Sequence, residues 1–557
     1  MSTTDSRGAS APLPSATRDH DLDALRGFAM LLGIALHASL SFFPGFWVVV
    51  DSTADNDNWF DEFFHAVHGF RMPLFFLLSG YFTAMLWRRR GLNRLARHRL
   101  ERIALPLAIF VLPMGLVMTW SVEQSIDAGV SDYIEENEDI WAAVFFGNEN
   151  AVKKLIDNGV DVDAQNFAEG GDTPLHVAAF TGDAPMAELL LERGADVHIA
   201  AGGGRPVDYA VFVGSAEVAE VLVAAGADDP RPAGGTWTDI EFWAEGAGEA
   251  AQAQDELGLD PWVGTGWWQN LNHLWFLWFL LWLVAGFAVV ALAIEHLIPR
   301  GATPGKWSGL LMWSLIPLTL IPQLAMGQGG EIRVFGPDTS TGWVPEWHVL
   351  AYYAVFFAFG SLLYGRPSRG GGQLVGTIGR WWPILLPVAA VAFAVALDRT
   401  FDEGASWWSA SIGQVAFAWL AIVALMGLFH TVLAKKRRGV RYLSDSAYWL
   451  YLAHLPLVIL AQLWIRNWDL PAGVKFVGLT TVITIFLLVT YQLFVRYTPL
   501  GTLLNGKRTR PATSTLEHID ADRPESTEPV ADDGHRQQPT VPGVVGPARR
   551  SSEEQPT

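Results

Sequence analysis

The 557-residue chain contains no cysteine. This absence excludes disulfide bonds, thiolate nucleophiles, and zinc or iron–sulfur sites that depend on cysteine ligands. Charged residues are also scarce, at 17% of the chain, whereas half of all residues are hydrophobic and 25 are tryptophan. Such a composition is typical of membrane proteins, in which tryptophan gathers at the two interfaces. The net charge of −19 argues against nucleic-acid binding.

Apolar segments predict an all-α integral membrane protein with about ten transmembrane helices. They lie near residues 22–43, 63–86, 103–120, 272–295, 307–324, 348–364, 382–398, 407–430, 444–465 and 474–496. Arginine and lysine gather in the loops after the second, sixth and eighth segments, and acidic residues gather in the opposite loops. The positive-inside rule therefore predicts a multi-pass protein of the inner (plasma) membrane with both termini cytoplasmic. The polar ends, 1–20 and 508–557, are predicted to be disordered.

A long polar insert separates the transmembrane regions 21–120 and 270–500. Within it, the motif Gly-x-Asp begins at residues 159, 194 and 226, close to the 33-residue period of ankyrin repeats. The segment from Gly171 to Gly182, GDTPLHVAAFTG, is the closest to an ankyrin consensus, with His176 bracing its first helix. We therefore predict an ankyrin α-solenoid over 138–229, and the charge bias places it outside the cytoplasm. The flanks, 121–137 and 229–270, are interpreted as linkers, with an interfacial stretch at Trp262–Trp268.

The first apolar segment contains three ionisable residues, Asp23, Arg26 and His37. Ionisable groups inside a transmembrane segment are costly and usually mark a functional site. Arg26 and His37 are eleven residues apart, which places both on one helix face, separated by roughly 16 Å along the axis. We expect the rest of the chain to build a polar chamber around this face.

Several motifs resemble the membrane acyltransferase-3 family. The first is the Leu22-Asp-Ala-Leu-Arg-Gly motif with His37 after it, and the second is Phe70-Arg-Met-Pro-Leu-Phe-Phe-Leu-Leu-Ser-Gly. The others are Arg99-Leu-Glu-Arg, Asn272-His-Leu-Trp-Phe-Leu and Tyr448-Trp-Leu-Tyr-Leu-Ala-His-Leu-Pro. The resemblance covers roughly 20–120 and 270–500. The residues of the second-helix motif and of His-Leu-Trp-Phe-Leu are most similar to those of family members that modify periplasmic glucans. The ankyrin insert departs from the usual pattern of the family.

The resemblance implies an O-acyltransferase that moves an acetyl or succinyl group from cytosolic acyl-CoA to a glycan hydroxyl. The acyl-CoA is a substrate, and no permanently bound cofactor and no metal are expected. A neutral imidazole suits removal of the hydroxyl proton. The implied catalytic residues are His37, as base or as transient acyl carrier, and Arg26; the implied donor-binding residues are Arg99 and Arg102. The implied substrate-binding residues are Asp23, Arg71, Ser79, His68 and His273.

Other interpretations remain open at this point. Arg26, Arg71, Arg99 and Arg102 can be interfacial or positive-inside residues, Ser79 can serve helix packing, and His273 and His454 can be structural. The chain can also be a transporter whose His and Arg line a pathway, or a membrane anchor that displays ankyrin repeats. The expected partners are a glycan or lipid-linked sugar acceptor outside the cytoplasm, membrane lipids, and a protein bound by the repeats.

Overall fold

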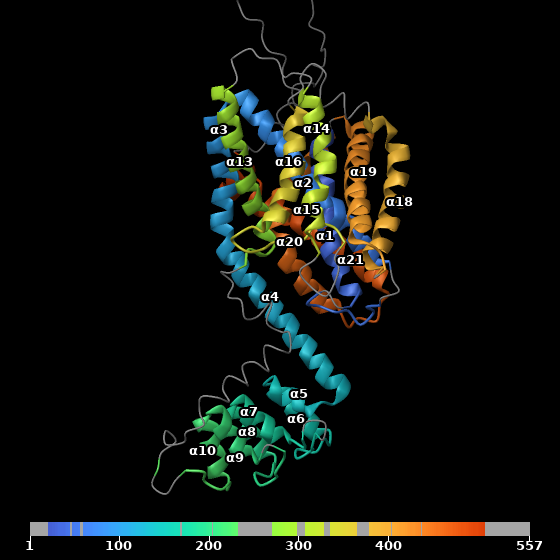
Figure 1. The fold of residues 1–557 in the computed structure, drawn as a ribbon. Coiled ribbons are helices and arrows are strands. Elements are labelled where there is room, and N and C mark those ends of the chain that lie inside the picture. The colour runs from blue at the N-terminus through green and yellow to red at the C-terminus, as the bar shows by residue number, and fades with distance from the viewer. Residues whose placement is uncertain are drawn as a thin grey trace, which may run out of the picture. The chain divides into compact units, whose positions relative to one another are not determined.

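The computed structural model describes residues 20–44, 47–55, 59–166, 170–202, 204–231, 235, 270–297, 307–327, 335–364, 378–402, 404–435 and 437–506. Within these ranges the regular elements are helices, accompanied only by isolated β-bridges. Nine helical stretches in the described part are long and apolar enough to cross a membrane (Figure 1). The terminal tails, the Trp262–Trp268 stretch and most of the 229–270 flank lie outside the described residues.

The bundle contains the long helices and several short ones. Before the repeats come α1 (His20–Ser39), η1 (Leu40–Phe42), α2 (Phe60–Arg90), α3 (Leu92–Arg99), the π-helical turn η2 (Leu100–Ala104) and α4 (Leu105–Asn137). After the repeats come η5 (Asn272–Leu274), α13 (Trp275–Leu297), α14 (Trp307–Leu318), α15 (Leu320–Leu324) and α16 (Trp347–Tyr364). The last are η6 (Gly379–Trp381), α18 (Trp382–Phe401), α19 (Trp407–Leu433), α20 (Arg438–Ile465), α21 (Ala472–Thr490), η7 (Tyr491–Val495) and α22 (Pro499–Asn505).

Two predicted transmembrane segments differ from the helices observed: one is divided in two, and the other continues beyond its predicted end. The segment near 307–324 forms two short helices, α14 and α15, with Pro317 inside the first and Thr319 between them. The third segment does not end near 120, because α4 continues to Asn137 and ends at Glu138, whose φ is 51°. Residues 121–137 are therefore helical rather than a flexible linker.

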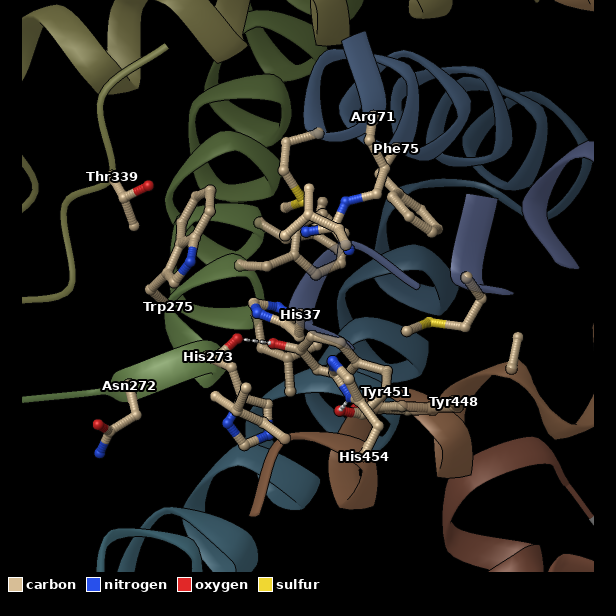
Figure 2. A pocket seen from close by; sticks show the side chains of 18 of the residues that line it. His37, Arg71, Phe75, Asn272, His273, Trp275, Thr339, Tyr448, Tyr451 and His454 are labelled. Carbon is tan, nitrogen blue, oxygen red and sulfur yellow. Dashed lines mark hydrogen bonds between the residues drawn. The ribbon is translucent and has the colours of Figure 1, made fainter. Parts of the chain in front are cut away.

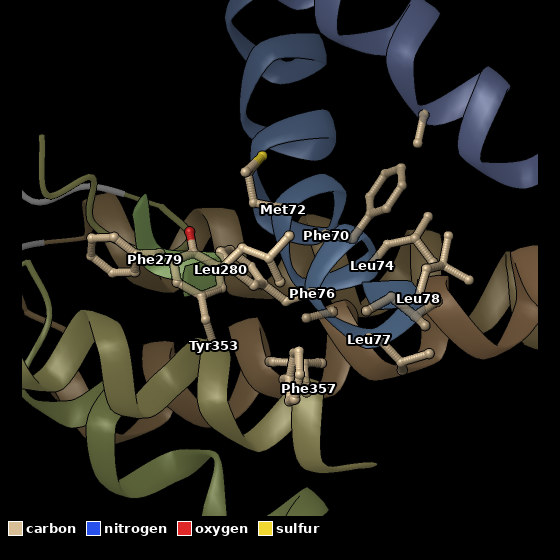
Figure 3. Close-up of a cluster of buried hydrophobic side chains, with 14 of the residues drawn as sticks. Phe70, Met72, Leu74, Phe76, Leu77, Leu78, Phe279, Leu280, Tyr353 and Phe357 are labelled. Carbon is tan, nitrogen blue, oxygen red and sulfur yellow. The ribbon is translucent and has the colours of Figure 1, made fainter. Parts of the chain in front are cut away.

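Close backbone contact joins α2 to α16 in the bundle core (Figure 3). A Cβ atom on Gly80 would lie 2.0 Å from the carbonyl oxygen of Phe357, and one on Gly360 would lie 1.9 Å from that of Leu77. Only glycine fits these two positions, which is a common use of small residues between membrane helices. The Gly80 half of the Ser79-Gly80 pair thus serves packing.

The repeats consist of paired helices, with α5 (Ile140–Phe145), α7 (Pro174–Thr181) and α9 (Pro206–Val213) first in each pair. Their partners are α6 (Glu149–Asp157), α8 (Ala184–Glu192) and α10 (Ala216–Ala224). Thr173 and His176 form a reciprocal capping box on α7, and the His176 ring also bonds the Gly204 carbonyl of the next repeat at 3.2 Å. The bracing role predicted for His176 agrees with this geometry.

Candidate active site

A cavity of about 760 Å³ lies within the bundle and follows α1 from Arg26 to His37. It is lined by side chains of α1, α2, α3, α4, α13 and α20, together with η1, η2, η5, α22 and the loops near Trp47 and Thr339. We call its two ends the basic end and the histidine end. The basic end is lined by Arg26, His98, Arg99, Arg102, Ser444, Asp445 and Asn505, and the histidine end by His37, His68, Arg71, His273 and His454.

Arg26 is held at the basic end by the start of α20. Its Nη2 donates to the Ser444 carbonyl oxygen at 3.0 Å and to the Ser444 hydroxyl at 2.8 Å. Asp23, one turn earlier on α1, lies 3.7 Å from the same Nη2 and accepts a hydrogen bond from the Ser444 hydroxyl at 3.4 Å. Asp23 is buried and is not among the residues that line the cavity. Asp23 therefore lies behind Arg26 and contacts it and Ser444, and its expected part in substrate binding stays a prediction.

Arg99 directly precedes the π-helical turn η2, Arg102 lies within it, and the two side chains reach different partners. Arg99 donates from Nη2 to the Thr83 hydroxyl at 2.7 Å, while its Nε has no hydrogen-bond partner. Arg102 donates to the carbonyl oxygens of Thr502 and Leu503, the latter at 2.7 Å, and so caps the last turn of α22. The short helix α22 thereby brings Leu504 and Asn505 to the cavity wall. The π-helical turn η2 is an irregularity of a kind that often occurs at functional sites.

Three histidines from different elements meet at the opposite end (Figure 2). The His37 ring centre lies 5.3 Å from that of His454, which lies 5.7 Å from that of His273. Nδ1 of His454 faces the carbonyl oxygens of Leu450 and Tyr451 at 3.0 and 2.9 Å, so this nitrogen carries the proton in the neutral ring. Its Nε2 then keeps a free lone pair, and this atom has no hydrogen-bond partner.

The other two histidines of this cluster also keep one ring nitrogen without a partner. His273 donates from Nε2 to the Leu452 carbonyl oxygen at 3.0 Å, which leaves Nδ1 with a lone pair and no partner. The Nδ1 of His37 is likewise buried without a partner. Because buried polar atoms are normally hydrogen-bonded to protein or water, these three nitrogens are available to a molecule that enters the cavity, water included.

Gln462 positions His37 by capping the end of α1. Its amide nitrogen donates to the carbonyl oxygens of His37 and Ala38 at 2.9 and 3.3 Å, and its oxygen accepts from the Trp47 indole at 2.8 Å. These bonds satisfy carbonyl groups that a helix end otherwise leaves exposed. Gln462 is itself buried, so the end of α1 is fixed to α20.

Arg71 lies beside α1 between Arg26 and His37. A Cβ atom on Gly33 would lie 2.1 Å from Nη1 of Arg71, so the absence of a side chain at Gly33 makes room for the guanidinium. Nε of Arg71 is buried without a hydrogen-bond partner. The acidic residue Asp61, in the first turn of α2, lies 3.1 Å from Nε2 of His65.

An irregular segment, 335–342, lines the histidine end. His68 donates from Nε2 to the Pro337 carbonyl oxygen at 2.9 Å, and the Gly336 amide donates to Gln414 at 3.0 Å. The Leu271 amide donates to the Thr341 carbonyl oxygen at 2.8 Å. Non-helical backbone at membrane depth occurs where it lines a cavity or is buried in protein. This segment brings the hydroxyl-bearing residues Thr339 and Thr341 to the wall, near Asn270 and Asn272.

Most residues that the sequence singled out share this cavity. Arg26, His37, His68, Arg71, Ser79, Arg99, Arg102 and His273 all line it, and Asp23 is placed behind Arg26. Sequence reasoning did not identify Gln462, the Thr339–Thr341 wall or α22. A signal existed for part of the missed set, because Ser444, Asp445 and Gln462 are polar residues inside the apolar segment 444–465. In the described part, no group of three or more His, Cys, Asp or Glu side chains is placed to hold a metal ion.

The cavity thus has a basic end and a histidine-lined end within a multi-helix bundle. The acyltransferase-3 family, described as an acyltransferase domain, matches residues 19–152 and 207–493. These ranges include well over half of the chain, and the chain therefore belongs to this family. Three ankyrin repeats match residues 140–231. The interpretation of the chain as an enzyme with inserted repeats is confirmed.

Curated relatives are named glucans biosynthesis protein C. Those of Escherichia coli strains K12 and HS are both 33% identical to this chain over 139 residues, which is 24% of this chain. The match spans about a third of the relatives' length, at 35%.

Proposed function

We propose that this acyltransferase moves an acetyl or succinyl group from acyl-CoA, bound at the basic end, to a hydroxyl of a glycan that enters at the histidine end. The observation that carries this proposal is the single cavity, which contains Arg26, Arg99 and Arg102 at one end and His37 at the other. The name of the glucans biosynthesis relatives supports a glucan as the acceptor.

The basic end suits an anionic donor. Three guanidinium groups line it, and such groups bind phosphate oxygens with charge-assisted hydrogen bonds. Their described hydrogen-bond acceptors at this end include neutral oxygens of Ser444, Thr83 and Leu503, which a phosphate can replace or join. Between the ends, the wall is mainly apolar, with Met30, Met72, Phe75 and Phe276. A thioester arm extended over the ~16 Å between Arg26 and His37 fits this geometry.

At the histidine end the acceptor hydroxyl attacks the thioester carbonyl carbon. A neutral His37 takes the hydroxyl proton as the new C–O bond forms, the C–S bond then breaks, and the CoA thiolate leaves and is protonated. Arg71 stabilises the negative charge that develops on the carbonyl oxygen. In the second form of the mechanism, a His37 nitrogen attacks the thioester carbonyl, the C–S bond breaks and CoA leaves as the thiol. The acceptor hydroxyl then attacks the acyl-histidine, the C–N bond breaks, and the released imidazole takes up the hydroxyl proton.

The opposite wall of the histidine end suits a neutral sugar acceptor. Asn270, Asn272, Thr339 and Thr341 provide amide and hydroxyl groups, and Trp47 and Trp275 provide flat apolar faces. Sugars combine hydroxyl groups with apolar ring faces, so this mixture matches their surface. With the basic loops in the cytoplasm of an inner membrane, the donor enters from the cytoplasm and the acceptor from outside. Both termini are then cytoplasmic and the repeats lie outside.

The test is transfer of radiolabel from acetyl-CoA or succinyl-CoA to glycans by membranes that contain the protein or its His37→Ala variant. Loss of a general base lowers rates by about 10²–10⁴-fold, so His37→Ala should show no detectable transfer. The matched control is His296→Ala, which changes an exposed histidine at the end of α13. Full transfer by His37→Ala would refute the mechanism, and absence of transfer from both donors by the unmodified protein would favour transport.

A further inference from the structure

The first helix of each ankyrin repeat carries a phenylalanine at the same position. A glycine with a φ between 66° and 78° follows each of α5, α7 and α9 and marks the same point in every repeat. The residues two positions before these glycines are Phe145, Phe180 and Phe212. Since α7 contacts both α5 and α9, the three side chains occupy equivalent places on neighbouring helices. We call these three residues the aromatic ladder.

The aromatic ladder is not part of the core of the repeats. Within the described residues, that core is built from other positions of the same helices, such as Leu175, Ala179 and Ala210, all fully buried. By contrast, Phe212 is 39% exposed, and Phe145 and Phe180 are half-buried. Partly exposed aromatic side chains at equivalent positions of neighbouring helices are typical of sites that bind another molecule.

The ladder lies in a strongly acidic setting. Residues 138–229 contain 17 Asp and Glu but only four Lys and Arg. At least three of these four are paired, Lys153 with Glu149, Arg193 with Asp157 and Arg205 with Asp228. The remaining carboxylates repel an acidic polymer or an acidic segment and attract a basic one.

We propose that the aromatic ladder docks a basic, amphipathic segment of another protein. Two or three apolar side chains of that segment pack on Phe145, Phe180 and Phe212, and its lysine and arginine side chains meet the surrounding carboxylates. Surfaces of repeat proteins suit such extended segments. This proposal does not depend on the acyltransferase mechanism, because no residue of the ladder lines the cavity.

The test uses the purified full-length protein as bait for a displayed library of random peptides of about 15 residues. Selection is run against the unmodified protein and against a Phe180→Ser, Phe212→Ser double variant that retains its thermal unfolding profile. The best enriched peptide is then synthesised, and its Kd is measured by fluorescence anisotropy. Tyr133→Ser is the matched control, since Tyr133 is an exposed aromatic residue of α4 outside the ladder.

The expected result is enrichment of peptides rich in Lys and Arg that carry two or three apolar residues. Their Kd should rise about tenfold or more in the double variant, rise with added salt, and remain unchanged in Tyr133→Ser. Enrichment of acidic peptides, or equal enrichment on the double variant, would overturn the proposal. Binding that appears only after deletion of residues 236–262 would also overturn it, because that segment of the same chain would then be the occupant.

Discussion

His176, the buried histidine of the repeats, differs from the buried histidines of the cavity in how its ring nitrogens are used. In the repeats, Nδ1 of His176 lies 2.8 Å from the Thr173 hydroxyl and Nε2 lies 3.2 Å from the Gly204 carbonyl oxygen. In the cavity, His37, His273 and His454 each keep one buried nitrogen without a partner. Nδ1 of His65, which is buried outside the cavity, also lacks a partner. It is therefore the convergence of three such nitrogens on one cavity that marks a candidate site for chemistry.

The same contrast extends to other groups on the cavity wall. Nε of Arg71, Nε of Arg99 and Nδ2 of Asn505 are also buried without a hydrogen-bond partner. By comparison, Lys475 and Asp51, both buried, pair at 2.9 Å, and Lys475 also donates to the Arg466 carbonyl oxygen at 2.9 Å. Removal of an unpaired group from the cavity should therefore change the reaction, whereas removal of a fully paired group elsewhere should change stability.

Arg71→Leu should have the largest effect among the substitutions that test this contrast. Loss of one donor to a developing oxyanion lowers kcat by about 10²–10³-fold, and little stability should be lost because Nε of Arg71 lacks a partner. The measurement is the initial rate of acyl transfer at saturating donor, together with thermal unfolding in detergent. Arg399→Leu, at an exposed arginine of α18, is the control. An Arg71→Leu protein with normal kcat would contradict the assigned role.

Arg99→Leu should affect binding of the donor more than the chemical step. A charge-assisted hydrogen bond to a phosphate contributes about 1.5–3 kcal/mol, which corresponds to a rise of about tenfold or more in KM for acyl-CoA. The kcat should change much less, because Arg99 lies at the end opposite His37. Arg97→Leu is the control on the same helix, since Arg97 is exposed and paired with Glu101. Equal changes in the two variants would show that general surface charge, not the cavity, binds the donor.

Gly33→Ala tests whether the position of Arg71 matters without removal of its charge. The added methyl group would lie 2.1 Å from Nη1 of Arg71, so the guanidinium must move. We expect kcat to fall by about tenfold, less than in Arg71→Leu, because a small displacement of a catalytic group is costly. Gly286→Ala is the control, as no atom lies within 4 Å of a Cβ there. If both variants retain the same kcat, the Arg71 contact is not required.

The sequence was sufficient for those features that are determined within one segment. The shared face of Arg26 and His37 follows from helical periodicity, and the ankyrin repeats follow from the spacing of their Gly-x-Asp motifs. The bundle itself follows from the lengths of the apolar runs. In each case the necessary information lies within a few turns of helix or in a short repeat.

Features that depend on contacts between distant segments could not be predicted. Gln462 caps α1 from 425 residues away, and Arg102 bonds the carbonyl of Leu503 from 401 residues away. Nothing in the local sequence of Thr339 or Thr341 distinguishes a cavity wall from an ordinary loop. Likewise, the end of α4 was misjudged because the polar composition of 121–137 suggested a linker, although only Gly129 in it disfavours a helix.

His176→Ala should have the smallest effect on acyl transfer. Unlike His37→Ala, it should lower the stability of the protein and not its activity. It should leave acyl transfer unchanged but destabilise the repeats by about 1–3 kcal/mol, because the buried Thr173 amide and the Gly204 carbonyl lose a partner. Hydrogen exchange of repeat peptides in the full-length protein measures this loss. His198→Ala, at an exposed histidine of the same repeats, should leave exchange unchanged.

The dependence of the repeats on pH follows from the same contacts. Burial lowers the pKa of His176 below its usual value of 6.5, so the unfolded chain binds a proton at higher pH than the folded repeats do. The stabilisation is therefore complete above pH 6.5 and is lost as the pH falls from 6.5 towards the lowered pKa. Protection factors of the repeat amides, which correct for the intrinsic pH dependence of exchange, should fall between about pH 7 and pH 5, and this fall should be weaker in His176→Ala. An equal fall in both proteins would assign the pH response to other groups and leave the paired histidine without the predicted role.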